Sequence, residues 1–296
     1  MRFTLENDKI SIAVHGEGGE LKSLFDKGGS KEYLWQGEKQ YWSDSAPNLF
    51  PYIARLTDET YTYKGNLFHM GIHGFIKDME LEGKKLKEEL VFELKADDCT
   101  KQCYPFQFIY KIRYRLLGTS VIITYEVENI DNKNIYFGIG GHPGFQVPFI
   151  GDTVFEDYYL EFEGNKKPIR IRMSQDCFVL GEEPFEGLEN RRLRLSHQLF
   201  DNDAVILKEM GKQVVLKTDK SDKSVTVTFP DMDYLGIWHK PNTKAPYICI
   251  EPWSSLPSRK GIIEDLEEQE NLICLPAGEI YKNTWIITLD SREIVD

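Results

Sequence analysis

Residues 106–128, FQFIYKIRYRLLGTSVIITYEVE, decide the fold class of this chain. Apolar residues fall on every second position from Phe106 to Leu116, and the alternation returns after the turn residues 118–120. A period of two places alternate side chains on opposite faces of a strand, whereas a helix needs apolar residues three or four apart. We therefore predict an antiparallel hairpin with one buried face.

The same alternation recurs along the chain in short segments separated by turn residues. We expect further strands at residues 9–14, 21–25, 90–94, 213–218, 225–229, 234–239, 247–251 and 281–289. Many short strands with turns between them are typical of sandwiches and barrels. The prediction is an all-β protein, a large antiparallel β-sandwich. Because no Pro-, Gly- or Ser-rich linker divides the chain, we expect a single domain over residues 1–296, with one short helix at residues 261–268.

Composition excludes several classes of protein. The net charge of −12 argues against binding of nucleic acid, whose phosphates attract basic surfaces. We expect no secretory signal, because the N-terminus lacks an apolar segment, and no membrane contact, because apolar runs fall far short of about 20 residues. The odd, scattered set of five cysteines fits reduced thiols, so we expect a cytoplasmic protein.

The segment 247–253, YICIEPW, could carry chemistry. An apolar strand leads to Glu251, and we expect Pro252 to end that strand because proline has no N–H for a ladder. A carboxylate at the rim of an apolar strand is a candidate general base, and Trp253, Trp238 and Tyr247 are candidates to stack on a sugar ring. The alternative readings are a surface glutamate and ordinary core aromatics.

Two histidines lie in glycine-rich segments that cannot be normal central strands. His73 is flanked by Gly71 and Gly74, and His142 follows Gly140-Gly141 and precedes a proline. Glycines let the backbone bend tightly and bring an imidazole close to a ligand, and histidine suits proton transfer near neutral pH. Each could equally be structural or part of a tight turn.

Four further residues are candidate ligands for sugar hydroxyls. Arg55 ends an apolar segment and could donate from its guanidinium, unless it forms a salt bridge with Asp58 or Glu59. Asp201 and Asp203 stand just before a strand, where a carboxylate could bind two hydroxyls or simply form a turn. His239 ends the strand 234–239 and could line the same pocket.

Taken together and in order, these segments resemble the aldose 1-epimerase (galactose mutarotase-like) family, and most of all its lacX-type branch. The segments that carry the resemblance are PNLFPYIARL (47–56), GIHGF (71–75), GGHPGF (140–145), LFDNDAVIL (199–207), YLGIWHKP (234–241) and ICIEPW (248–253). Each is weak alone, but they extend over most of the chain in the family's order.

The resemblance implies a galactose mutarotase-like sandwich that interconverts the α and β anomers of a free hexose without cofactor or metal. It assigns three catalytic residues: Glu251 takes the proton from O1, His142 protonates the ring oxygen, and His73 orients the sugar. Arg55 and Asp203 hold the other hydroxyls, Asp203 being preferred to Asp201 because it directly precedes the apolar strand. Trp253 and His239 complete the expected sugar-binding set.

Two departures leave alternatives open. Gly144 follows the His-Pro pair where mutarotases proper have a bulky aromatic residue, and Ile76-Lys77 stands where a glucose-6-phosphate epimerase branch tends to carry an arginine. The alternatives are a hexose-6-phosphate 1-epimerase, a non-catalytic sugar-binding protein on the same scaffold, and a metal-dependent enzyme with His73, His142 and Glu251 as ligands. The expected partner is a small-molecule sugar, and the expected state is a monomer or homodimer.

Overall fold

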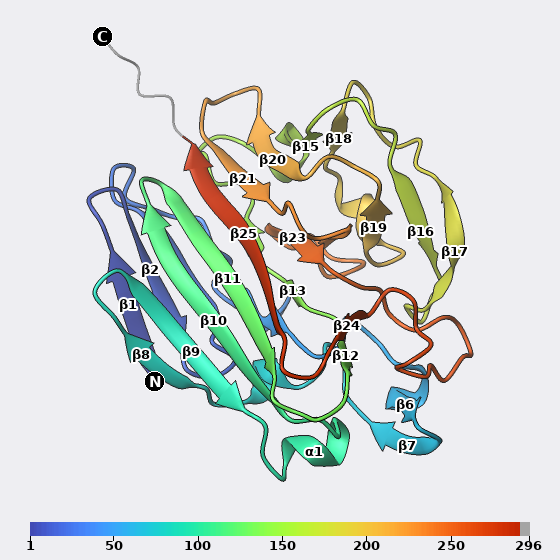
Figure 1. Cartoon of the computed structure of the whole chain (residues 1–296). Helices are drawn as coiled ribbons and strands as arrows, with labels where there is room; N and C mark the ends of the chain where they lie inside the picture. The colour runs from blue at the N-terminus through green and yellow to red at the C-terminus, as the bar shows by residue number, and fades with distance from the viewer. Residues whose placement is uncertain (291–296) are drawn as a thin grey trace.

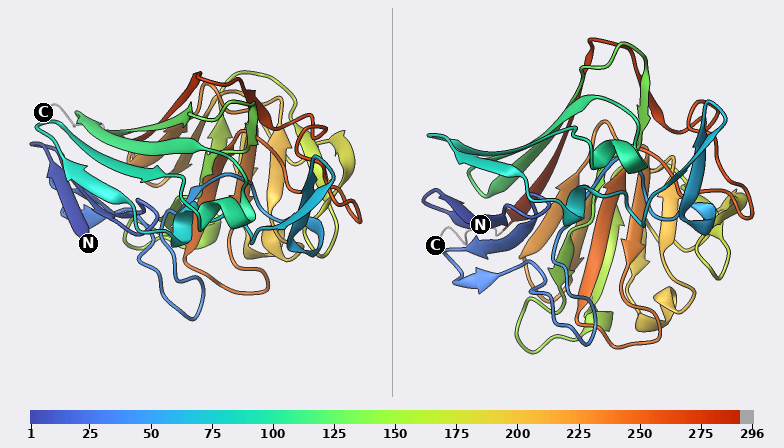
Figure 2. Two further views of the ribbon diagram at one scale, coloured as in Figure 1. Left: turned by 60° about the horizontal axis from the view of Figure 1, so that its bottom comes forward. Right: turned by 90° about the horizontal axis from the view of Figure 1, so that it is seen from below.

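The computed structural model describes residues 1–290, in which two large antiparallel sheets face each other (Figures 1 and 2). The larger sheet has nine strands, and its order from one edge to the other is β18 (Arg192–Arg194), β15 (Tyr158–Phe162), β20 (Gln213–Thr218), β21 (Ser224–Thr228), β25 (Ile280–Asp290), β11 (Ser120–Asn129), β10 (Phe108–Leu117), β9 (Glu89–Lys95) and β8 (Glu82–Lys85). Its centre is the predicted hairpin, in which Leu117 pairs with Ser120 across the turn.

The second large sheet has eight strands and positions the site described below. Seven of them follow the order β17 (Val179–Pro184), β16 (Ile169–Met173), β19 (Val205–Lys208), β22 (Tyr234–Trp238), β23 (Tyr247–Trp253), β13 (Gly140–Gly141) and β5 (Asn48–Leu49). The eighth strand, β14 (Gly144–Gln146), pairs with β23 beside this path.

Smaller elements complete residues 1–290. A four-stranded sheet holds β1 (Arg2–Glu6), β2 (Ile10–His15), β3 (Leu21–Asp26) and β4 (Lys31–Glu32), and two-stranded sheets pair β6 (Thr60–Tyr63) with β7 (Asn66–His69) and β12 (Ile135–Phe137) with β24 (Ile273–Leu275). Within the described residues, helical structure is limited to α1 (Thr100–Cys103) and the 3-10 turns η1 (Thr57–Glu59), η2 (Ile76–Asp78), η3 (Phe155–Asp157) and η4 (His197–Phe200). The all-β antiparallel prediction is confirmed.

The helix expected at residues 261–268 is wrong, because this segment bonds to a strand and to its own turn. The N–H of Thr62 donates to the carbonyl of Glu264, and the N–H of Leu266 donates to the carbonyl of Thr62. The carboxylate of Glu264 also accepts the backbone N–H and the guanidinium of Arg259. These tertiary contacts use the backbone groups that a helix would need, so local propensity does not decide the conformation.

Strand β23 separates the hydrophobic core from the outer face of the eight-stranded sheet. Ile248 and Ile250 point inward to the main hydrophobic core, which also takes side chains from the larger sheet. Because side chains alternate along a strand, Tyr247, Cys249, Glu251 and Trp253 share the opposite face. The strand runs through Pro252 to Trp253, so the expected stop at the proline is wrong.

The proline is tolerated because it lies where the ladder to the neighbouring strands is interrupted. On one side of β23, the N–H of Ile250 donates to the carbonyl of Pro143 and the N–H of Ser254 donates to the carbonyl of Ile139. Pro252 lies midway between these two donors, opposite the break between β13 and β14. No donor is required there, so the missing N–H leaves no bond unmade. The same break contains His142.

Candidate active site

A cavity of about 280 Å³ opens on the outer face of the eight-stranded sheet. Loops from six other parts of the chain, at residues 42–47, 54–55, 72–77, 142, 177 and 203–204, surround the strand residues that form its floor. The lining residues are Trp42, Asp44, Pro47, Ala54, Arg55, Ile72, His73, Lys77, His142, Met173, Cys177, Asp203, Ala204, Ile206, Trp238, Glu251 and Trp253. The structure therefore brings all three residues predicted to be catalytic into one cavity, together with Arg55, Asp203 and Trp253.

Glu251 and His142 form the buried centre of this cavity. Glu251 is 1% exposed on β23, and His142, 8% exposed, projects from the break between β13 and β14. The N–H of His142 donates to the carbonyl of Pro47, which fixes the backbone. Its Nε2 lies 3.1 Å from Oε2 of Glu251. A carboxyl group and an imidazole are thus in contact inside the cavity.

Burial dominates the electrostatics of this pair. Removal from water, reinforced by the charge of Asp203, raises the pKa of the Glu251 carboxyl well above its ordinary value. Burial also lowers the pKa of His142 to about 3. Both shifts favour the uncharged forms, a carboxylic acid beside a neutral imidazole. This neutral pair has the same total number of protons as a carboxylate beside an imidazolium.

The pair also has unused hydrogen-bonding capacity. Nδ1 of His142 and Oε2 of Glu251 are buried without a hydrogen-bond partner among residues 1–290. The contact between Oε2 and Nε2 has the distance of a hydrogen bond but not its angular geometry. Because buried polar groups in folded proteins are normally bonded, these atoms are the ones that a bound ligand would satisfy.

His73 faces the pair from a strained turn. Its φ of 66° lies in the left-handed region, and its ring packs edge-to-face with His142 at 5.3 Å between centroids. Nδ1 of His73 accepts a hydrogen bond of 3.1 Å from the N–H of Ala54, and the N–H of His73 donates to the carbonyl of Ala54. With Nδ1 used as an acceptor, the proton of the neutral ring is on Nε2. His73 therefore presents a donor, and burial keeps its pKa well below the usual value.

The glycine after His73 provides a first test of how this turn is held. Gly74 has a φ of 73°, and a Cβ there would lie 2.2 Å from the carbonyl oxygen of Phe50. We expect Gly74→Ala to lower the free energy of unfolding by at least about 2 kcal/mol, from backbone strain and the collision. Gly71→Ala is the matched control, since no atom lies within 4 Å of its Cβ. Urea unfolding checks both variants, and equal stabilities would contradict the tight-turn account.

Arg55 and Asp203 reach the cavity from different loops. Arg55 is exposed, and among residues 1–290 no carboxylate lies within ion-pair distance of it, so the expected alternative of a salt bridge with Asp58 or Glu59 is not found. Asp203 has a φ of 71° and accepts a short hydrogen bond from the thiol of Cys177, which holds one carboxylate oxygen. The guanidinium and the second carboxylate oxygen remain for ligand hydroxyls.

His239 and Asp201 lie elsewhere. Within residues 1–290 neither is among the residues that line the cavity. Trp238 takes the cleft side of the strand end, and the next side chain, His239, turns the other way and packs on Phe155 and Phe200. Nδ1 of His239 donates to the carbonyl of Lys240, so its Nε2 accepts the Nδ1–H of His197 at 3.1 Å. The structure therefore does not bring His239 to the predicted sugar site.

The buried position of His239 gives a pH-dependent stability that can be measured. Burial lowers its pKa to about 4, against about 6.5 in an unfolded chain. The unfolded state therefore binds the proton more readily, and stability is lost as pH falls through this window. From pH 7 to pH 5 we expect His239 to account for roughly 1–2 kcal/mol of lost unfolding free energy. His239→Gln should flatten the dependence in urea unfolding, whereas the exposed control His69→Gln should leave it unchanged.

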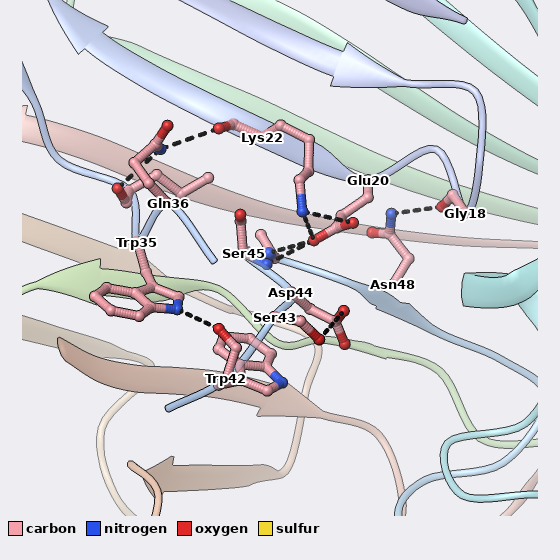
Figure 3. Close-up of polar contacts among 12 residues, drawn as sticks. Gly18, Glu20, Lys22, Trp35, Gln36, Trp42, Ser43, Asp44, Ser45 and Asn48 are labelled. Carbon is pink, nitrogen blue, oxygen red and sulfur yellow. Dashed lines mark hydrogen bonds and ion pairs between the residues drawn. The ribbon is translucent and has the colours of Figure 1, made fainter. Parts of the chain in front are cut away.

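Sequence reasoning missed the loop that covers His142. Trp42 packs on the His142 ring at 4.9 Å between centroids and meets Trp238 edge-on. Three contacts hold the loop (Figure 3): Nε1 of Trp35 donates to the carbonyl of Trp42, and the Glu20 carboxylate accepts the N–H groups of Ser45 and Ala46. No periodicity marks such a loop, so the sequence carried no signal for it.

Gly144 shows why this chain departs from the aromatic residue expected after the His-Pro pair. A Cβ at position 144 would lie 2.9 Å from the Trp42 ring and 3.2 Å from Cβ of Trp35. The indole of Trp42 therefore needs the space that a side chain at position 144 would fill. Trp42 supplies an aromatic surface beside His142 from a different segment of the chain.

Comparison with known proteins shows the family to which this chain belongs. A family model for aldose 1-epimerase matches residues 1–284. The chain belongs to the aldose 1-epimerase family. Protein LacX of Lactococcus lactis is 32% identical to it over 98% of this chain and 99% of its own length. The resemblance to the family and to its lacX-type branch is confirmed.

Solved structures of aldose 1-epimerase relatives show the same fold. A galactose mutarotase related enzyme from Lactobacillus acidophilus is 31% identical, covers 99% of both chains and superposes with a TM-score of 0.94. A galactose mutarotase-like protein from Lactobacillus casei, also 31% identical, covers 98% of this chain and 100% of its own with a TM-score of 0.93. In residues 1–290, none of the helices has the length and apolar character needed to cross a bilayer.

Proposed function

We propose that this protein is an aldose 1-epimerase that interconverts the α and β anomers of a free hexose by acid–base ring opening and closure. The observation that supports this most is the convergence of Glu251, His142 and His73 in one cavity, with Oε2 and Nε2 of the first two 3.1 Å apart. Arg55 and Asp203 at the rim supply a donor and an acceptor for the remaining hydroxyls.

The reaction needs one proton removed from O1 and one delivered to the ring oxygen, after which rotation about C1–C2 and the reverse transfers close the ring. Glu251 acts as the base at O1, and His142 as the acid at the ring oxygen. A carboxylic acid beside an imidazole carries as many protons as a carboxylate beside an imidazolium. Moving one proton across the contact between Glu251 and His142 therefore produces the base and the acid without exchange with solvent.

His73 holds the sugar in register with the pair. Its Nε2–H is fixed as a donor by the hydrogen bond from Ala54 to Nδ1. A neutral donor that points at O1 or the ring oxygen stabilises negative charge that develops there during ring opening. The indoles of Trp42, Trp238 and Trp253 line the same cavity and offer apolar surface for a pyranose.

The charges around the cavity favour a neutral sugar over a sugar phosphate. Arg55 and Lys77 line the cavity together with the carboxylates of Asp44 and Asp203, while burial favours the uncharged form of Glu251. The Lys77 ammonium is already paired with Asp78, at 2.7 Å. We therefore propose that the substrate is a free hexose. We also propose that the protein acts in the cytoplasm, where its five free cysteines remain reduced.

Polarimetry tests the activity directly. Fresh α-glucose, α-galactose and their 6-phosphates are followed with and without the protein, and we expect acceleration over the spontaneous rate for at least one free hexose. Isothermal titration with the same panel separates the alternatives. Binding without acceleration would favour a sugar-binding protein, and acceleration confined to the phosphates would favour a hexose-6-phosphate epimerase.

The two aspartates of the segment 199–207 give a matched pair of variants. We expect Asp203→Asn to raise KM by roughly 10- to 100-fold, because a hydrogen bond to a charged group contributes about 1.5–3 kcal/mol. Asparagine tolerates the positive φ of Asp203, so the turn is preserved. Asp201→Asn should leave KM unchanged, since Asp201 is exposed and outside the cavity. Similar KM values for the two variants would remove Asp203 from the sugar site.

A further inference from the structure

A third potential ligand lies against the Glu251–His142 pair. One ligand atom each of His142, Cys249 and Glu251 lies within 4.8 Å of the other two, and all three side chains are buried. Cys249 and Glu251 are two residues apart on β23 and so share its outer face, and His142 reaches them from the break between β13 and β14. We propose that these three side chains form a binding site for a divalent ion of the zinc class, and that an ion bound there blocks the epimerase reaction.

The donor set selects the kind of ion. Thiolate, imidazole and carboxylate are the three ligand types that Zn²⁺ uses in proteins, whereas Mg²⁺ and Ca²⁺ prefer oxygen alone. Three protein ligands leave a fourth tetrahedral position, which here opens to the cavity that His142 and Glu251 line. Coordination takes Cys249 as the thiolate, so its proton is released to solvent when the ion binds.

The distances fit with little movement. Two ligands on a tetrahedral Zn²⁺ at about 2.0 Å lie about 3.3 Å from each other, and Nε2 of His142 is 3.1 Å from Oε2 of Glu251. A sulfur at about 2.3 Å from the ion would lie about 3.5 Å from either of them. The three ligand atoms lie within 4.8 Å of one another already, so their separations need to shorten by at most about 1.5 Å for all three to coordinate one ion.

The ligand atoms are available for coordination. Oε2 of Glu251 is buried without a hydrogen-bond partner among residues 1–290, and Nε2 of His142 lies 3.1 Å from it on the side of the cavity. His73, considered as a ligand from the sequence, is not in the cluster, and the N–H of Ala54 already occupies its Nδ1. The ion reaches the site through the cavity. The thiolate of Cys249, which is 0% exposed, coordinates the ion from the side away from the cavity opening.

An ion in this position competes with catalysis. It takes the carboxylate oxygen and the imidazole that the proposed reaction needs for proton transfer. This inhibition rests on the proposed function, whereas the binding of the ion does not. The two parts therefore need separate readouts.

The binding test uses the full chain after removal of metal by dialysis against a chelator. We expect Zn²⁺ to bind at one ion per chain in calorimetric titration, and Co²⁺ to give a thiolate-to-metal absorption band in the near ultraviolet. Cys249→Ala should abolish the band and weaken Zn²⁺ binding by at least about 10-fold. Cys177→Ala is the matched control, because its thiol lies in the same cavity but outside the cluster, and it should change neither readout.

Thermal unfolding confirms that each variant is folded, and Cys249→Ser provides a second sulfur-free variant if alanine destabilises the strand. Equal affinity in the parent and both Cys249 variants would overturn the site, as would a cobalt band that is lost with Cys177→Ala instead.

The inhibition test uses polarimetry on the same proteins. We expect Zn²⁺ to slow the parent at least about 10-fold and a chelator to restore the rate, in keeping with the loss of a proton-transfer group. Cys249→Ala should retain the basal rate and lose the sensitivity to Zn²⁺ at the same concentration. Equal inhibition of parent and variant would overturn the assignment of Cys249. If no sugar is converted, the proposed function fails, and the calorimetric and cobalt measurements still decide the metal site.

Discussion

Replacing Glu251 with glutamine is expected to lower the mutarotation rate by at least about 10²-fold. Glutamine keeps the volume and one carbonyl oxygen of the side chain but cannot accept the proton from O1. Because the carboxyl lies 3.1 Å from Nε2 of His142, its loss also removes the partner with which His142 shares a proton. Initial rates on fresh α-galactose or α-glucose, corrected for spontaneous mutarotation, give the effect.

The stability of the same variant provides the control. Burial raises the pKa of the Glu251 carboxyl, which means that the folded protein holds a charge there only at a cost in free energy. A neutral amide avoids that cost, so the melting temperature of Glu251→Gln should equal or exceed that of the parent. Sugar affinity should stay within a few-fold. A rate equal to that of the parent would remove Glu251 from the mechanism, and a lower melting temperature would contradict the account of its environment.

Sequence predicts best where one simple periodicity controls the conformation. The alternation from Phe106 to Val127 specifies a hairpin because slipping it by one residue would expose every buried side chain. Residues 261–268 show the limit of such reasoning, since their backbone groups pair with β6 and with the turn at Arg259. That pairing depends on residues about 200 positions away in sequence, and no local pattern contains it.

In the candidate site, too, some residues could be predicted from local sequence and others could not. Glu251, His142 and His73 could be found because each lies in a segment that glycine or proline makes unlike an ordinary strand. His239 was misplaced because its position at a strand end is compatible with either face, and the packing on Phe155 and Phe200 decides between them. Trp42 was missed because a loop without periodicity gives no indication of what it covers. Side-chain direction at strand ends and loop placement are thus tertiary properties.

Glu251 and His142 are expected to act as a unit, and a double variant measures this. His142→Gln alone should lower the mutarotation rate by about 10²- to 10⁴-fold, because an amide cannot deliver the proton to the ring oxygen. If both residues serve the same proton transfers, then combining Glu251→Gln with His142→Gln should slow the reaction little beyond the slower single variant. Two independent contributions would instead multiply, to a rate at least about 10⁴-fold below the parent.

Whether the effects of the two substitutions multiply depends on whether Glu251 and His142 share one proton. Once Glu251 is an amide, His142 has no partner from which to receive a proton in the buried pair, and its own pKa of about 3 leaves it unprotonated at neutral pH. The imidazole then contributes little, so removing it as well changes little. Polarimetry on the parent, the two single variants and the double variant closes the cycle, with thermal unfolding to confirm that all four proteins are folded. Multiplicative effects would mean that the two side chains act separately, and the proposed sharing of one proton across the 3.1 Å contact would be wrong.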